Sequence, residues 1–89
     1  MSQLTHSYGT LLSTLHERSS LLAAPSATIP PSVNRTLKRQ IEAFARALQQ
    51  DRSEGRLDRR DAQTKWERIE ESLQGDEEGR RLLLAAKDK

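Results

Sequence analysis

The longest uninterrupted pattern of regularly spaced apolar residues in the chain runs from Val33 to Leu48. With about 100° between successive residues of a helix, these apolar side chains fall within a sector roughly 80° wide. They are Val33, Leu37, Ile41, Phe44 and Leu48. Arg35, Arg39 and Arg46 fall on the opposite side, and neither glycine nor proline interrupts the segment. The pattern predicts an amphipathic helix over residues 32–53, ended by Gly55, against which the other helices pack.

A narrower apolar stripe predicts an earlier helix over residues 3–24. The stripe consists of Leu4, Tyr8, Leu11, Leu15 and Leu22. Gly9 and many serines and threonines lower the helix propensity of this segment, so we expect it to need a neighbouring helix. The adjacent charges of Glu17 and Arg18 are expected to add little to stability. All three prolines of the chain lie in residues 25–31, which are predicted to be a linker.

Two further helices are predicted in the C-terminal half of the chain. The first covers residues 58–74, with Asp58 as its expected N-cap. Its apolar stripe consists of Ala62, Trp66, Ile69 and Leu73. The second covers residues 76–87, with Asp76 as its expected N-cap. Its apolar run, residues 82–86, has no preferred face, which is typical of a short helix that is buried on several sides or contacts a partner.

Together these patterns predict one all-α domain over residues 1–89, a small three-helix bundle with a short fourth C-terminal helix. A chain of 89 residues is near the lower end of what folds alone, and its core is necessarily small. The apolar stripes exceed what such a core is expected to bury. We therefore expect self-association or a protein partner.

The residue types that carry catalysis or bind cofactors occur at unsuitable spacings. The chain has no cysteine, and His6 and His16 would lie some 15 Å apart on one helix, so no metal site is expected. Its glycines occur singly and form no phosphate-binding loop. Adjacent carboxylates on a helix point in different directions, and general acid and base catalysis needs converging groups in a pocket. The sequence predicts no enzymatic activity, no cofactor and no small-molecule substrate.

The predicted location follows from the apolar runs of the chain. None approaches the roughly 18 residues of a membrane-spanning helix. The N-terminal segment also lacks the basic and apolar regions of a signal peptide. We expect a cytoplasmic protein, or a nuclear one if the source is eukaryotic, with no contact with a membrane.

Contact with a protein partner is the function that the apolar pattern favours. The candidate contact residues are Leu11, Leu15, Trp66, Leu82, Leu83 and Leu84. Trp66 is central in its stripe, so a place in the core is its more common role, whereas tryptophan is also enriched among interface anchors. The three consecutive leucines cannot all face one small core. The leading hypothesis is a non-enzymatic protein–protein interaction module, such as a small adaptor, regulator or complex subunit.

The net charge of +2 is unevenly distributed along the chain. Residues 35–60 hold eight basic and four acidic residues, whereas residues 61–78 hold two basic and seven acidic ones. Guanidinium groups suit phosphates and carboxylates, so the candidate contacts for a polyanion or an acidic partner are Arg35, Arg39, Arg46, Arg59 and Arg60. Binding of nucleic acid through residues 35–60 is the alternative function. The interleaved acids weaken it, and we expect the arginine side of the segment from Val33 to Leu48 to be complementary to the acidic stretch 61–78, in this copy or another.

Overall fold

The computed structural model describes residues 3–23 and 29–87, which form four helices and no strand. The helices are α1 (Gln3–Ala23), α2 (Pro31–Ser53), α3 (Arg59–Ser72) and α4 (Glu77–Lys87). The all-α prediction is confirmed for these residues. The predicted end of the first helix at residue 24 and the linker residues 25–28 lie outside the described residues. Proline at the first position of α2 is favourable, because its missing N–H would have no partner inside the helix.

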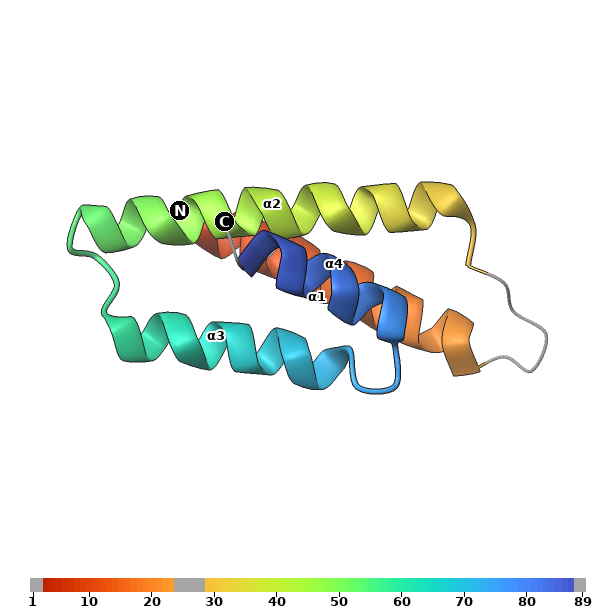
Figure 1. Cartoon of the computed structure of the whole chain (residues 1–89). Helices are drawn as coiled ribbons and strands as arrows, with labels where there is room; N and C mark the ends of the chain where they lie inside the picture. The colour runs from red at the N-terminus through yellow and green to blue at the C-terminus, as the bar shows by residue number, and fades with distance from the viewer. Residues whose placement is uncertain (1–2, 24–28, 88–89) are drawn as a thin grey trace.

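Successive helices run in opposite directions along a molecule of 45 × 21 × 19 Å. Figure 1 shows α2 and α3 along opposite edges, with α1 behind them and α4 crossing in front. α1 packs against α2 and α3, and α4 packs against α2. Within the described ranges, no helix has the length and apolar character needed to span a membrane.

The end of α2 is defined by Gly55, as predicted. Its φ of 76° lies in the left-handed region, which glycine adopts without a steric penalty. The N–H of Arg56 donates to the carbonyl of Asp51 at 2.8 Å, and the N–H of Gly55 donates to that of Arg52 at 3.2 Å. These two bonds make a Schellman motif, which satisfies carbonyls left open at the helix end.

Aspartates start both C-terminal helices, again as predicted. The Asp58 carboxylate accepts a hydrogen bond from the Asp61 N–H at 2.8 Å at the start of α3. The Asp76 carboxylate accepts one from the Gly79 N–H at 3.0 Å at the start of α4. Each cap satisfies a backbone donor that the helix itself cannot bond. α3 ends at Ser72, two residues before the predicted end, with Leu73 as its C-cap.

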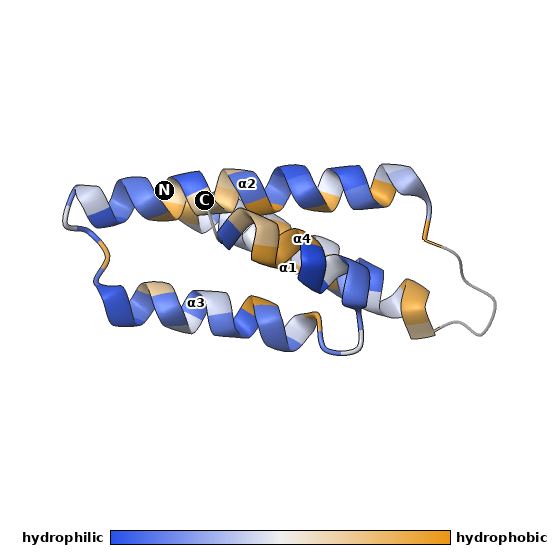
Figure 2. Ribbon diagram, in the orientation of Figure 1, coloured by the Kyte–Doolittle hydropathy of each residue, from blue (hydrophilic) through white to orange (hydrophobic). Residues whose placement is uncertain are grey.

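The core draws apolar side chains from all four helices. It consists of Leu4, Leu11, Leu15, Leu37, Ile41, Phe44, Ala47, Leu48, Ala62, Trp66, Ile69, Leu73 and Leu83. The central stripe predicted for α2 is therefore largely correct, although Val33 in its first turns is only partly buried. The visible faces of α2 and α3 are largely hydrophilic (Figure 2), as expected for helices with one buried side.

The stripe predicted for α1 is wrong at its C-terminal end. The spacing of Leu22 predicts that it is buried, yet it is 45% exposed, and Leu21 beside it is 40% exposed. The last turn of α1 extends beyond the ends of α3 and α4 (Figure 1), so few atoms are available to cover these side chains.

Two glycines give a matched test of packing. A methyl group at Gly79 would lie 2.6 Å from Cδ2 of the buried Leu73 and 2.7 Å from Oδ2 of Asp76, whereas one at Gly9 would meet no atom within 4 Å. We expect Gly79→Ala to lower the free energy of unfolding by about 1–3 kcal/mol, because neither neighbour can move freely. Gly9→Ala should raise it by about 0.5–1 kcal/mol through helix propensity. Urea unfolding of both variants checks this, and a stabilised Gly79→Ala protein would contradict the close packing.

Candidate functional site

The six predicted partner-contact residues occupy different places in the structure. Leu11, Leu15 and Leu83 are almost completely buried, and Trp66 is 9% exposed. In the described chain these four belong to the core, which leaves them little surface with which to contact a partner. Leu82 is partly buried, and Leu84 is 52% exposed. The run of leucines is thus divided by the helical twist of α4, which turns Leu83 inward and Leu84 outward.

The five predicted arginine contacts are all exposed, namely Arg35, Arg39, Arg46, Arg59 and Arg60. Among the described residues, none of the five forms an ion pair. Within one copy, the arginines of α2 therefore form no ion pair with residues 61–78, and contact with that stretch of another copy stays a prediction. The acids of that stretch are instead reached by Lys87, which contacts Glu70 at 2.8 Å, and by Arg18, which contacts Asp76. The arginines of α2 lie on its exposed side, away from the buried stripe through which Phe44 contacts Trp66 of α3.

Three aromatic rings form a row through the core. The rings of Tyr8 and Phe44 stack with centroids 5.5 Å apart, and those of Phe44 and Trp66 meet edge to face at 4.9 Å. Phe44 of α2 thus contacts both α1 and α3. The ammonium groups of Lys65 and Lys87 lie 5.1 Å from the Tyr8 centroid and 5.9 Å from the Trp66 centroid, within the range of cation–π attraction.

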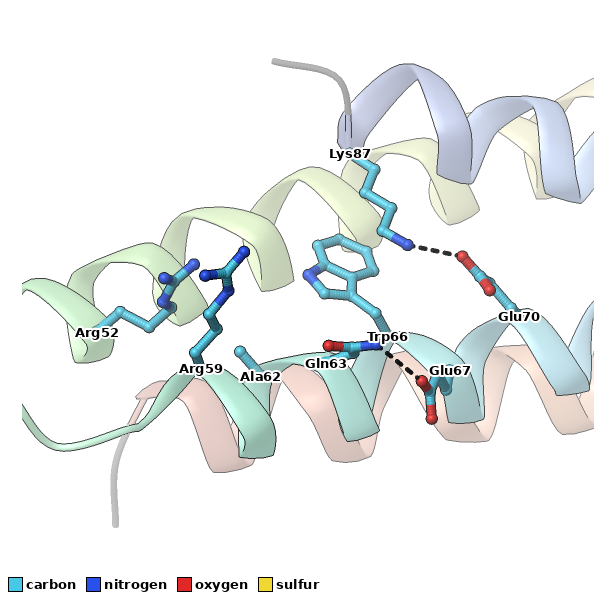
Figure 3. A pocket seen from close by; sticks show the side chains of 8 residues that line it. All are labelled: Arg52, Arg59, Ala62, Gln63, Trp66, Glu67, Glu70 and Lys87. Atoms are coloured by element: carbon cyan, nitrogen blue, oxygen red, sulfur yellow. Dashed lines mark hydrogen bonds and ion pairs between the residues drawn. The ribbon is translucent and has the colours of Figure 1, made fainter.

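A groove opens over the edge of Trp66, where α3 meets the C-terminal ends of α2 and α4. We call it the Trp66 groove; its volume is about 380 Å³. It is lined by Arg52, Arg59, Ala62, Gln63, Trp66, Glu67, Glu70 and Lys87. Figure 3 shows the side chains of Arg52 and Arg59 together at one end and the ion pair of Lys87 with Glu70 at the other.

A buried polar cluster lies near the other end of the molecule, where α1, α2 and the start of α4 meet. Arg18 is 1% exposed and pairs with the Asp76 carboxylate through Nε, with a second bond from Nη2 to Oδ1 at 3.2 Å. Its Nη1 donates to Oδ1 of Asn34 at 2.6 Å, and the Asn34 amide donates to Glu78 at 2.8 Å. The expectation that Arg18 adds little is wrong, because it connects three segments through charged hydrogen bonds.

The pKa of Asp76 reflects this setting. Burial by itself raises the pKa of this carboxyl group. The hydrogen bond from Arg18, the hydrogen bond from the Gly79 N–H and the charge of Arg18 lower it by more, so that the pKa lies below its ordinary value of 3.8. The sequence did contain one signal for the cluster, since Asp76 has the position of an N-cap. Nothing in the sequence showed that Arg18 would reach it.

The buried polar cluster around Arg18, here called the Arg18 cluster, and the Trp66 groove differ in the chemistry that they allow. The Arg18 cluster is closed, because its charged groups already bond one another. The Trp66 groove is open and presents the guanidinium groups of Arg52 and Arg59 beside an aromatic edge, an arrangement suited to binding an anion. Within residues 3–23 and 29–87, no three potential metal-ligating side chains lie together. No protein-family model, curated protein or solved structure matches this chain.

Proposed function

We propose that this chain is a non-enzymatic protein-interaction module, a small adaptor, regulator or complex subunit, that docks through the outer face of α4. In this proposal the first three helices form a small bundle, and the short fourth helix both closes it and presents the docking surface. The observation that carries the proposal is the position of Leu84, a large apolar side chain left 52% exposed beside the buried Leu83.

Further apolar surface lies elsewhere on α4. Ala85 is exposed next to Leu84, whereas Leu82 and Ala86 are only partly buried and lie about 200° around the helix from Leu84. A shallow hollow of about 200 Å³ adjoins Ala86 and is lined on the α2 side by Glu42, Ala45, Arg46 and Gln49. Covering a leucine completely contributes about 1.5–3 kcal/mol, so a partner that covers Leu84 gains a useful part of its binding free energy from this one contact.

Replacing Leu84 by serine is expected to weaken docking about tenfold or more without unfolding the protein. An exposed side chain contributes little to the core, so the variant should unfold at nearly the same urea concentration as the wild type. Light scattering after gel filtration and quantitative pull-down should show the loss of a dimer or of a bound protein. Leu21→Ser is the matched control, since Leu21 is similarly exposed but lies on α1. A wild-type protein that is monomeric and captures nothing, or equal losses in both variants, would contradict the proposal.

Nucleic-acid binding is the competing function, and one observation favours it. Arg35, Arg39 and Arg46 are exposed along α2, and none has an ion-pair partner among the described residues. Binding through their contacts with phosphate would weaken with salt, with a log–log slope near −0.9 for each phosphate neutralised on duplex DNA. Tight duplex binding with this slope, lost in Arg39→Gln and retained in Leu84→Ser, would replace the interaction proposal with this one.

A further inference from the structure

The arginine end of the Trp66 groove holds two cationic groups that nothing in the described chain neutralises. Arg52 is in the last turn of α2 and Arg59 is the first residue of α3, so the Schellman turn between them brings the two side chains together. Figure 3 shows their guanidinium groups side by side. Neither group forms a hydrogen bond or an ion pair with a described residue. Two like charges in this position repel each other unless an anion lies between them.

A third donor faces the same place. The indole nitrogen of Trp66 lies on the side of the ring that faces Arg59 in Figure 3. An indole N–H can only donate, and no acceptor bonds it among the described residues, although Trp66 is only 9% exposed. The indole nitrogen is accessible to solvent, since it is not one of the buried polar atoms without a partner, so it and the two guanidinium groups can all donate to one incoming acceptor.

The carboxylates of the groove itself do not supply this acceptor. Glu67 accepts a hydrogen bond from the Gln63 amide at 3.2 Å, and Glu70 is held by Lys87 at 2.8 Å. Both lie toward the other end of the groove (Figure 3). Their negative charges also oppose the approach of a highly charged anion such as a phosphate dianion, whereas a single carboxylate at the arginine end experiences less repulsion.

We propose that the Trp66 groove binds an acidic segment of a protein partner, with one glutamate or aspartate carboxylate held by Arg52, Arg59 and the indole N–H of Trp66. The planar fork of a guanidinium group matches the two oxygens of a carboxylate. The methyl group of Ala62 and the edge of Trp66 provide an apolar floor for the aliphatic part of that side chain. This inference rests on the proposed interaction function, since it specifies the chemistry of the partner.

The chain contains a built-in reporter for the test, because Trp66 is its only tryptophan. A short blocked peptide with a central glutamate between two leucines is titrated into the full chain while Trp66 fluorescence and the heat of binding are followed. The same peptide with glutamine in place of glutamate is the ligand control. We expect binding of the glutamate peptide alone, weakened about tenfold or more in Arg52→Gln and in Arg59→Gln, as loss of a charge-assisted hydrogen bond predicts.

Two other arginines serve as protein controls. Arg60 is next to Arg59 but does not line the groove, and Arg56 is already paired with Glu54 at 3.4 Å. Arg60→Gln and Arg56→Gln should leave the affinity within about twofold of the wild type, because neither side chain lines the groove and charges that do not contact the ligand are screened by solvent.

Three results would overturn the inference. They are equal binding of the two peptides, unchanged affinity in Arg52→Gln and Arg59→Gln, and stronger binding of inorganic phosphate or an oligonucleotide than of the glutamate peptide at this site. The proposed function fails separately, since it depends on Leu84. If docking depends on Leu84 but the glutamate peptide does not bind, the proposed function stands and only the acidic-segment site is disproved.

Discussion

Phe44→Ala is expected to lower the free energy of unfolding by about 3–5 kcal/mol, the usual cost of removing a buried phenylalanine ring. Phe44 is fully buried, and its ring contacts both Tyr8 and Trp66, so the substitution leaves a cavity between three helices. A domain of this size has little stability to spare. Far-UV circular dichroism during urea unfolding should show a largely unfolded protein at room temperature.

Phe44→Leu separates the loss of volume from the loss of the aromatic contacts. Leucine fills much of the same space, so we expect a smaller loss, near 1–2 kcal/mol, from the missing ring contacts and imperfect packing. Leu84→Ala serves as the exposed control and should change stability by less than about 0.5 kcal/mol. A Phe44→Ala protein as stable as the Leu84→Ala protein would mean that Phe44 is not at the centre of the core.

The ion pair of Arg18 and Asp76 should have an effect of similar size. Arg18→Met leaves the Asp76 carboxylate buried without its main partner, and Asp76→Asn leaves the Arg18 charge buried while keeping an N-cap oxygen. Breaking a buried pair by removing one partner typically costs about 3–5 kcal/mol. The double variant should lose less unfolding free energy than the two single variants together, because it leaves no charged group buried without a partner.

The exposed pair of Lys87 and Glu70 is the matched control for burial. Its side chains are 40% and 38% exposed, and such pairs contribute about 0–1 kcal/mol. Glu70→Gln should therefore unfold close to the wild type in urea. Equal effects of Glu70→Gln and Asp76→Asn would contradict a special role for the buried pair.

The buried pair also predicts a pH dependence. The pKa of Asp76 is lower in the folded chain than in the unfolded one, so its ionised form stabilises the fold above the ordinary value of 3.8. This contribution is lost as the pH falls through the folded pKa. The difference in unfolding free energy between wild type and Asp76→Asn should therefore be largest near neutral pH and shrink below about pH 4. A difference that is constant from pH 7 to pH 2 would show that ionisation of Asp76 does not matter.

The candidate interaction surfaces were only partly predictable from the sequence. Leu84 could be named as one of three adjacent leucines, but the sequence did not show which of them would remain exposed. Arg59 was one of the five arginines that the sequence indicated as candidate contacts, whereas Arg52 was not. Their place in one groove depends on the turn at Gly55 and on the position of Trp66 relative to both helices.

The sequence by itself determined the four helices, most of their ends and the central stripe of the core. These features arise from interactions between residues a few positions apart, such as the repeat of apolar side chains on one face and the caps at Gly55, Asp58 and Asp76. Only the tertiary structure decided that Arg18 is buried against Asp76, 58 positions away, and that Arg52 and Arg59 face the Trp66 indole. Such contacts depend on how each helix is rotated and placed against the others, and local periodicity does not specify that arrangement.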